Sequence, residues 1–186
     1  NPTSKDAGIY IGALPENVSP MDDTAPVAGA PTMLWAGNNA NFNVNGNGDI
    51  DLEGDVIAGA GKVSATISDK GDITVGNEKG DAKTTIMAQK DVTLKTKEGD
   101  IEVSKGIQST EESVSVQTGK GNIAVGRASK NEGEIIYDGE TIKANKNVTV
   151  GTDLGTIYIQ GETSTTTGDI TMTAGKDPYE QGTGAG

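Results

Sequence analysis

The sequence contains no cysteine and no histidine. These absences exclude disulfide bonds, thiol nucleophiles, Ser-His-Asp triads, and zinc sites built from thiolate or imidazole. Arg127 is the only arginine, and the formal net charge is −12. Because cations are few and carboxylates are in excess, a nucleic-acid backbone is disfavoured as a partner, and an anionic membrane surface is disfavoured for the same reason.

Aromatic residues, long apolar runs and helical periodicity are also scarce. Aromatic side chains make up 3% of the chain and hydrophobic side chains 33%, which is little for a globule with a thick core. No segment is apolar enough to span a bilayer, so no membrane-embedded part is expected, and no long stretch shows the apolar spacing of a helix. This composition fits a narrow tube filled by Ile, Val and Leu.

What the sequence does contain is a long internal repeat. Residues 99–120 match residues 155–176 without a gap, at an offset of 56 throughout. Further upstream, residues 71–76 match residues 121–126 at an offset of 50. Repetition of short strands separated by glycine and polar residues is typical of a solenoid, which more often displays a surface than runs a reaction.

The repeated unit is a glycine, then Asp, Asn or Thr, then two apolar residues with one residue between them. Apolar residues at i and i+2 point to one face of a β-strand, and so short a strand buries too little to be stable alone. A chain that coils, and lays each strand on an earlier one, satisfies both the backbone and the apolar pairs. These pairs are Ile50/Leu52, Ile73/Val75, Ile101/Val103, Ile123/Val125, Ile157/Ile159, Ile170/Met172, Val92/Leu94, Val114/Val116 and Val148/Val150.

We therefore predict an all-β fold, a parallel β-helix over residues 41–176, with roughly six to seven coils at the usual strand spacing. Residues 1–40 hold five of the six prolines and are expected to form an irregular N-terminal cap. Residues 177–186 are expected to be a flexible tail. An antiparallel β-sandwich stays open as the alternative. The expected anchors of the cap are Ile9, Tyr10, Ile11, Met33, Leu34 and Trp35.

The strands and their connecting phrases resemble those of filamentous haemagglutinin-like surface proteins, and most closely the leukotoxin-type filamentous adhesins of bacteria with a Gram-negative envelope. The phrases that carry the resemblance are residues 71–76, 147–155 and 161–174, and it extends over about residues 44–180. It implies a right-handed β-helical shaft, secretion through an outer-membrane partner, and attachment to host or neighbouring cells. The family's amino-terminal secretion domain is not recognisable in this sequence.

One segment matches a chemical motif. Residues 43–51 are similar to the first nine positions of an EF-hand or dockerin calcium loop, with oxygen ligands at alternate positions and a glycine at the sixth. The twelfth position, which needs an acidic ligand, is Gly54. We prefer a β-helix corner here and no cofactor, with calcium as the alternative. The candidate ligands are Asn43, Asn45, Asn47, Asp49 and Asp51.

Carboxylates could also form an active site, as in polysaccharide lyases and hydrolases built on β-helices. Four aspartates, however, occupy one repeat position, and repetition in every coil indicates a turn role, whereas an active site needs a unique constellation. These are Asp49, Asp72, Asp100 and Asp169. The outward positions are too mixed for the threonine ladder of an ice-binding face: Asp51, Thr74, Thr93, Glu102, Ala124, Thr149, Tyr158 and Thr171.

These observations predict a structural and binding role without catalysis. The chain is expected to be a shaft segment of an extracellular bacterial filamentous adhesin, located at the cell surface, with a host-cell or neighbouring-cell protein or glycan as partner. It begins at Asn1 without Met and is interpreted as a piece of something larger that is monomeric in isolation. The alternatives are a carbohydrate-active β-helix enzyme and a fibre component of a phage or surface appendage.

Overall fold

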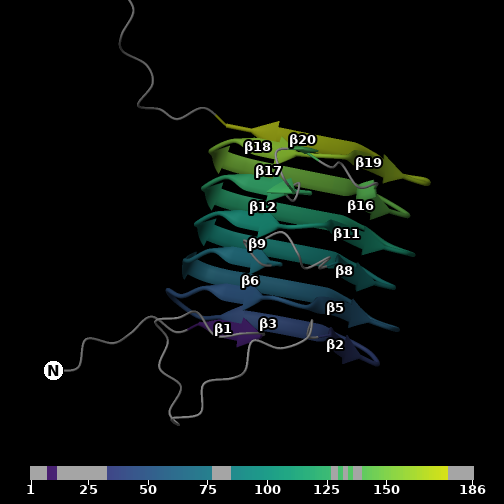
Figure 1. Cartoon of the computed structure of the whole chain (residues 1–186), viewed down its shortest axis with the longest axis horizontal. Helices are drawn as coiled ribbons and strands as arrows, with labels where there is room; N and C mark the ends of the chain where they lie inside the picture. Colours follow the sequence, from purple (N-terminus) through teal and green to yellow (C-terminus); the bar gives the residue numbers. More distant parts are fainter. Residues whose placement is uncertain are drawn as a thin grey trace, which may run out of the picture.

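The computed structural model describes residues 8–11, 33–76, 85–126, 130–131, 134–135 and 140–175. In this part of the chain three six-stranded sheets stand around a common axis (Figure 1). All pairings within these sheets are parallel, so the predicted parallel β-helix is confirmed and the antiparallel sandwich is excluded. None of the described segments is a helix long and apolar enough to cross a membrane.

We name the sheets A, B and C in the order in which the chain passes through them. Sheet A contains β1 (Ile9–Ile11), β4 (Ile50–Leu52), β7 (Ile73–Val75), β10 (Ile101–Val103), β13 (Ile123–Val125) and β18 (Ile157–Ile159). Sheet B contains β2 (Met33–Ala36), β5 (Asp55–Ala58), β8 (Thr85–Ala88), β11 (Gly106–Ser109), β16 (Glu140–Ala144) and β19 (Glu162–Thr165). Sheet C contains β3 (Ala40–Val44), β6 (Val63–Lys70), β9 (Val92–Glu98), β12 (Val114–Lys120), β17 (Val148–Leu154) and β20 (Ile170–Ala174).

The sequence repeat corresponds to two coils. In sheet A, Ile101 pairs with Ile123, and Ile123 pairs with Ile157, so the matching residues Ile101 and Ile157 are two coils apart. The lengths of the connections from sheet A to sheet B explain why the repeat spans two coils and not one. They are short after β4, β10 and β18 but long after β7 and β13, and the second long connection contains the antiparallel pair β14 (Lys130–Asn131) and β15 (Glu134–Ile135). Long and short connections alternate, so the sequence repeats every second coil.

The core is a continuous apolar column inside the three sheets. The strands of the inner coils bury alternate residues, and Ile50, Ile73, Ile101 and Ile123 form one file in sheet A that is 0% exposed. The apolar pairs of the inner coils are therefore placed as predicted. The last predicted pair is a correction, because Ile170/Met172 lies at an inward register position in β20 but is exposed. No described strand follows β20 in sheet C.

The N-terminal segment differs from the prediction of an irregular cap over residues 1–40. Two of its described parts are strands, since β1 pairs with β4 and β2 pairs with β5, so the coils begin before residue 41. Leu34 packs against the core, whereas Met33 and Trp35 are 64% and 65% exposed. Because successive side chains of a strand point to opposite faces, an inward Leu34 turns both of its neighbours outward.

Ile9 and Ile11 also pack against the core, as expected of anchors. The side chain of Tyr10, most of the proline-rich segment and the predicted tail at 177–186 lie outside the described residues.

Candidate functional site

The candidate calcium ligands are spread over two sheets. The first lies on β3 in sheet C, the last on β4 in sheet A, and the other three in the corner between these strands. Asn47 and Asp49 each use Oδ1 to accept a hydrogen bond from a backbone N–H of the next coil, at 3.3 and 2.9 Å. Among the residues that the structure describes, no three His, Cys, Asp or Glu side chains gather closely enough to hold a metal ion. The five residues are Asn43, Asn45, Asn47, Asp49 and Asp51.

A ladder of Asx side chains runs along the corner that leads into sheet A. Each side-chain Oδ1 accepts a hydrogen bond from the backbone N–H at the same position one coil later. These N–H groups belong to Asp72, Asp100, Asn122 and Thr156, and their acceptors are Asp49, Asp72, Asp100 and Asn122, at 2.9, 2.7, 2.6 and 3.0 Å. The carboxylates of Asp49, Asp72 and Asp100 thus have the turn role that their repetition predicts.

Asp169 does not belong to this ladder, although it stands in the same Gly-Asp-Ile phrase. It precedes β20 in sheet C, and its N–H donates to Asn147 Oδ1 at 3.0 Å. The same corner contains Asp91, whose Oδ1 accepts from Ser113 N–H at 3.2 Å, and Ser113, whose Oγ accepts from Asn147 N–H at 3.3 Å. The placement of all four aspartates at one structural position is therefore wrong for Asp169, because the same phrase serves two different corners.

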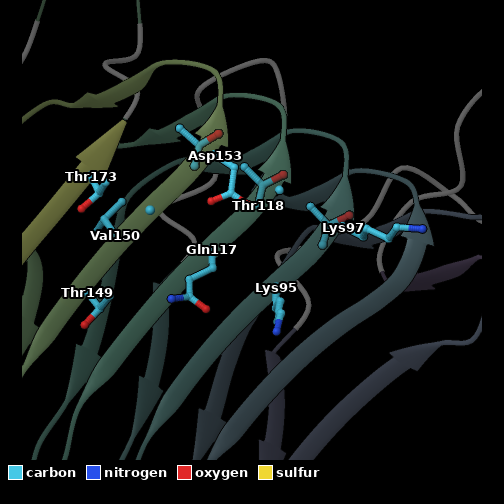
Figure 2. A pocket seen from close by; sticks show the side chains of 12 residues that line it. Lys95, Lys97, Gln117, Thr118, Thr149, Val150, Asp153 and Thr173 are labelled. Carbon is cyan, nitrogen blue, oxygen red and sulfur yellow. The ribbon is translucent and has the colours of Figure 1, made fainter. Parts of the chain in front are cut away.

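A polar groove of roughly 430 Å³ crosses the outward face of sheet C (Figure 2). It is lined by β9, β12, β17 and β20, so it runs along the solenoid axis across four successive coils. Gly151 leaves space on this face, since a Cβ there would meet only the Thr173 carbonyl oxygen, at 3.9 Å. The strand register places four of the lining residues in one file across the groove: Lys95, Gln117, Gly151 and Thr173.

The groove is suited to hydrogen bonding. The ammonium of Lys95, the amide of Gln117 and the hydroxyls of Thr149 and Thr173 all line it (Figure 2). Of the lining residues only Asp153 carries a carboxylate. Glycoside hydrolysis by the usual mechanism needs two carboxylates across the scissile bond, so this arrangement offers binding of a polar ligand rather than that chemistry.

One of the two lysines that line the groove, Lys97, forms an ion pair, as do Lys70 and Lys120. Lys97 Nζ lies 2.9 Å from Asp69 Oδ1, and this hydrogen bond raises the pKa of Lys97 above its ordinary value of 10.5. Glu98 accepts from Lys120 at 3.0 Å and lies 3.2 Å from Lys70, and these two lysines lower the pKa of Glu98 below 4.5. Within the described part of the chain Lys95 has no ion pair.

A file of hydroxyl groups beside the groove is not evident from the sequence. The outward positions named from the sequence belong to two different sheets. Those on sheet C share one file with two serines that the sequence analysis does not name. The strand register aligns them into an unbroken file of Ser64, Thr93, Ser115, Thr149 and Thr171. To find this file from the sequence, one would need the register of β6, β9, β12, β17 and β20. That register is hard to derive because the connections between these strands differ in length from coil to coil.

Comparisons of the chain with models of protein families, with curated proteins and with solved structures gave no match. Function is therefore inferred from the fold and from the chemistry of its surface. The features available for this are the regular stack, the two Asx corners and the polar face of sheet C.

Proposed function

We propose that this chain is a segment of an extracellular bacterial filamentous adhesin, in which the solenoid serves as a shaft. The observation that carries the proposal is the stack of six parallel strands in each of three sheets. Each coil is hydrogen-bonded to the next through all three sheets, so the unit can be lengthened by further coils without a change in cross-section. Six strands at the usual spacing span roughly 25 Å along the axis.

The proposed partner is a protein or glycan on the surface of a host or neighbouring cell. The polar face of sheet C supports this role, because Lys95, Gln117 and Thr149 present hydrogen-bonding groups on a rigid platform. The net charge of −12 supports a partner other than a phosphate backbone.

Attachment to cells tests the binding part of the proposal. Beads coated with the chain are expected to attach to epithelial or bacterial cells more than beads coated with albumin. A double change on the groove, Lys95→Ala with Gln117→Ala, should reduce attachment, and a matched change on the outer face of sheet A, Thr74→Ala with Glu102→Ala, should not. Equal attachment of the parent and albumin beads across both cell types would argue against this function.

Length tests the shaft part. Tandem duplication of residues 99–154, one two-coil unit, should lengthen the particle by about 10 Å in small-angle X-ray scattering and leave its cross-section unchanged. A globular increase in size would contradict the shaft.

The competing enzymatic function is tested by turnover. We expect no release of reducing or unsaturated sugar ends from neutral or acidic polysaccharides, because Asp49, Asp72 and Asp100 serve the corner ladder. Product release that a single Asp→Asn change abolishes would replace the adhesin with a carbohydrate-active enzyme.

A further inference from the structure

The corner between β3 and β4 contains two Asn-Gly dipeptides in succession, Asn45-Gly46 and Asn47-Gly48. In such a pair the backbone nitrogen of the glycine can attack the side-chain amide of the asparagine, because glycine has no Cβ to hinder the approach. The nitrogen forms a bond to Cγ, the Cγ–Nδ2 bond breaks, and Nδ2 leaves as ammonia with the proton of the glycine N–H. Water then opens the succinimide at either carbonyl, and the product is aspartate or isoaspartate.

The second of the two pairs is held by the next coil. Gly48 N–H donates to the carbonyl oxygen of Lys70 at 2.8 Å, and Asn47 Oδ1 accepts from Lys70 N–H at 3.3 Å. One residue of β6 thus holds both reacting groups, the nitrogen of Gly48 and the amide of Asn47. Gly48 is also buried. Both bonds to Lys70 have to break before the nitrogen can attack, so this pair should be protected in the folded chain.

The first pair is held by an exposed side chain. Gly46 N–H donates to Ser68 Oγ at 2.7 Å, and Ser68 is exposed. Rotation about χ1 removes an exposed hydroxyl, and water can replace the lost bond, so this bond is easier to break than a backbone bond between coils. The side chain of Asn45 is exposed, and a Cβ on Gly46 would meet nothing within 4 Å. The space around Gly46 therefore accommodates the five-membered ring.

We propose that Asn45 is a site of spontaneous deamidation and isomerisation, and that stacking of the coils protects Asn47. The two asparagines lie two residues apart and each precedes a glycine, so their local sequence gives them the same chemistry. The difference between them comes from their contacts with β6. Water is the only co-reactant. The inference goes beyond the proposed shaft function and does not rest on it.

The conversion changes the corner in two ways. It adds a negative charge to a chain whose net charge is −12, and the isoaspartate form places an additional backbone carbon directly after β3. The same corner contains Asn47 and Asp49, whose Oδ1 atoms accept hydrogen bonds from the next coil. A longer backbone displaces these acceptors, so backbone hydrogen exchange in β3 and β4 should be faster in the isomerised chain than in the fresh chain.

The test is to age the full folded chain in mildly alkaline buffer at body temperature and to locate the conversion by mass spectrometry of proteolytic peptides, fragmented along the backbone. Asn45 should convert to a mixture of aspartate and isoaspartate, and Asn47 should show no measurable conversion over the same period. In denaturant, where the bonds to Lys70 are lost, the two asparagines should convert at similar rates. Asn45→Gln keeps an amide on a longer side chain and should abolish conversion at this position in the folded chain.

A further pair of variants tests the restraint on the nitrogen. Ser68→Ala removes the bond to Gly46 N–H and should raise the rate at Asn45, whereas Ser64→Ala, on the same strand, should leave that rate unchanged. A folded chain in which Asn45 keeps its amide while it converts in denaturant would overturn the proposed site. Equal conversion of Asn45 and Asn47 in the folded chain would overturn protection by stacking, and a rate that Ser68→Ala does not raise would overturn Ser68 as the restraint.

Discussion

The two ends of the solenoid are built from the same alternation of apolar and polar residues, yet they differ in what surrounds them. In sheet C, the inward residues of β3 at the N-terminal end are buried, and those of β20 at the C-terminal end are exposed. In Figure 1, β1, β2 and β3 form one end of the stack and β18, β19 and β20 the other. Burial therefore depends on stacking as well as on the strand pattern.

This difference has an energetic consequence. A residue of an inner coil contacts coils on both sides, whereas a residue of β20 has a described strand on one side only. Local opening should accordingly be easiest at the C-terminal end, where fewer apolar contacts and backbone hydrogen bonds have to be broken. Paired substitutions, one in an inner or N-terminal coil and one in β20, measure that difference.

The largest contrast is expected from a buried charge. Ile123 is fully buried between Ile101 and Ile157, so Ile123→Asp places an unpaired carboxylate in a narrow apolar column and should cost about 4 kcal/mol or more of unfolding free energy. Ile170→Asp, at an exposed position, should cost less than about 1 kcal/mol. Chemical denaturation of both variants measures the two values, and a parent-like curve for Ile123→Asp would show that the inward assignment is wrong.

Truncation of one apolar residue at each end gives the next contrast. Phe42 is buried in β3, and Phe42→Ala should cost about 3 kcal/mol through lost burial and the cavity that remains. Met172→Ala should cost less than about 1 kcal/mol, because nearly half of that side chain already faces water. Equal losses in thermal and chemical denaturation would mean that the two ends are equally covered in solution.

Substitutions at two corner glycines compare an inner coil with the first coil. Gly121 has a φ of 142°, and a Cβ there would lie 2.0 Å from the carbonyl oxygen of Gly99, so Gly121→Ala should cost about 2–3 kcal/mol. Gly46 also has a positive φ, 107°, but a Cβ there would meet nothing within 4 Å. Gly46→Ala should therefore cost only about 1 kcal/mol, from backbone strain alone. Similar losses for the two variants would show that close stacking of the corners contributes little.

The fold was predictable because its signal is local. The alternation of Ile73 with Val75, or of Ile101 with Val103, depends on residues two apart, and glycine before each strand marks the corner. The surface was not predictable to the same degree. Neighbours on the face of sheet C, such as Lys95 and Gln117, come from different coils, and the connections between coils differ in length.

Asp169 and Trp35 show two ways in which a prediction from a short stretch of sequence fails. Asp169 shares a phrase with Asp49 and Asp72 but serves another corner, because the corners into sheet A and into sheet C both use a side chain to accept from the backbone of the next coil. Trp35 was expected to anchor the cap, but the inward direction of Leu34 places the indole outside. In both cases the deciding information is the position of a strand in the coil, and a short phrase does not contain it.

The Asx ladder extends the comparison to single hydrogen bonds. Asp100→Ala removes the acceptor of a 2.6 Å bond from Asn122 N–H and should cost about 1 kcal/mol, since water can replace part of the bond at this corner. Asp169→Ala should change stability by less than about 0.5 kcal/mol, because no described coil follows it. Thermal denaturation at one pH is sufficient to measure both, and a large loss for Asp169→Ala would indicate that the last carboxylate already has a partner.

The smallest effect is expected from the charges that join the inner coils. Lys120 and Lys70 lower the pKa of Glu98, because they stabilise its ionised carboxylate in the folded state more than in the unfolded state. The resulting stabilisation is fully present above the ordinary pKa of 4.5 and is lost as the pH falls through the lower folded value. Glu98→Gln should therefore bring the melting temperature close to that of the parent in strong acid, and slightly below it near neutral pH. Added salt should shrink the neutral difference, because the three side chains lie at the surface and their interaction is screened. A difference that persists unchanged from neutral pH into strong acid would assign the effect of Glu98 to packing rather than to its charge.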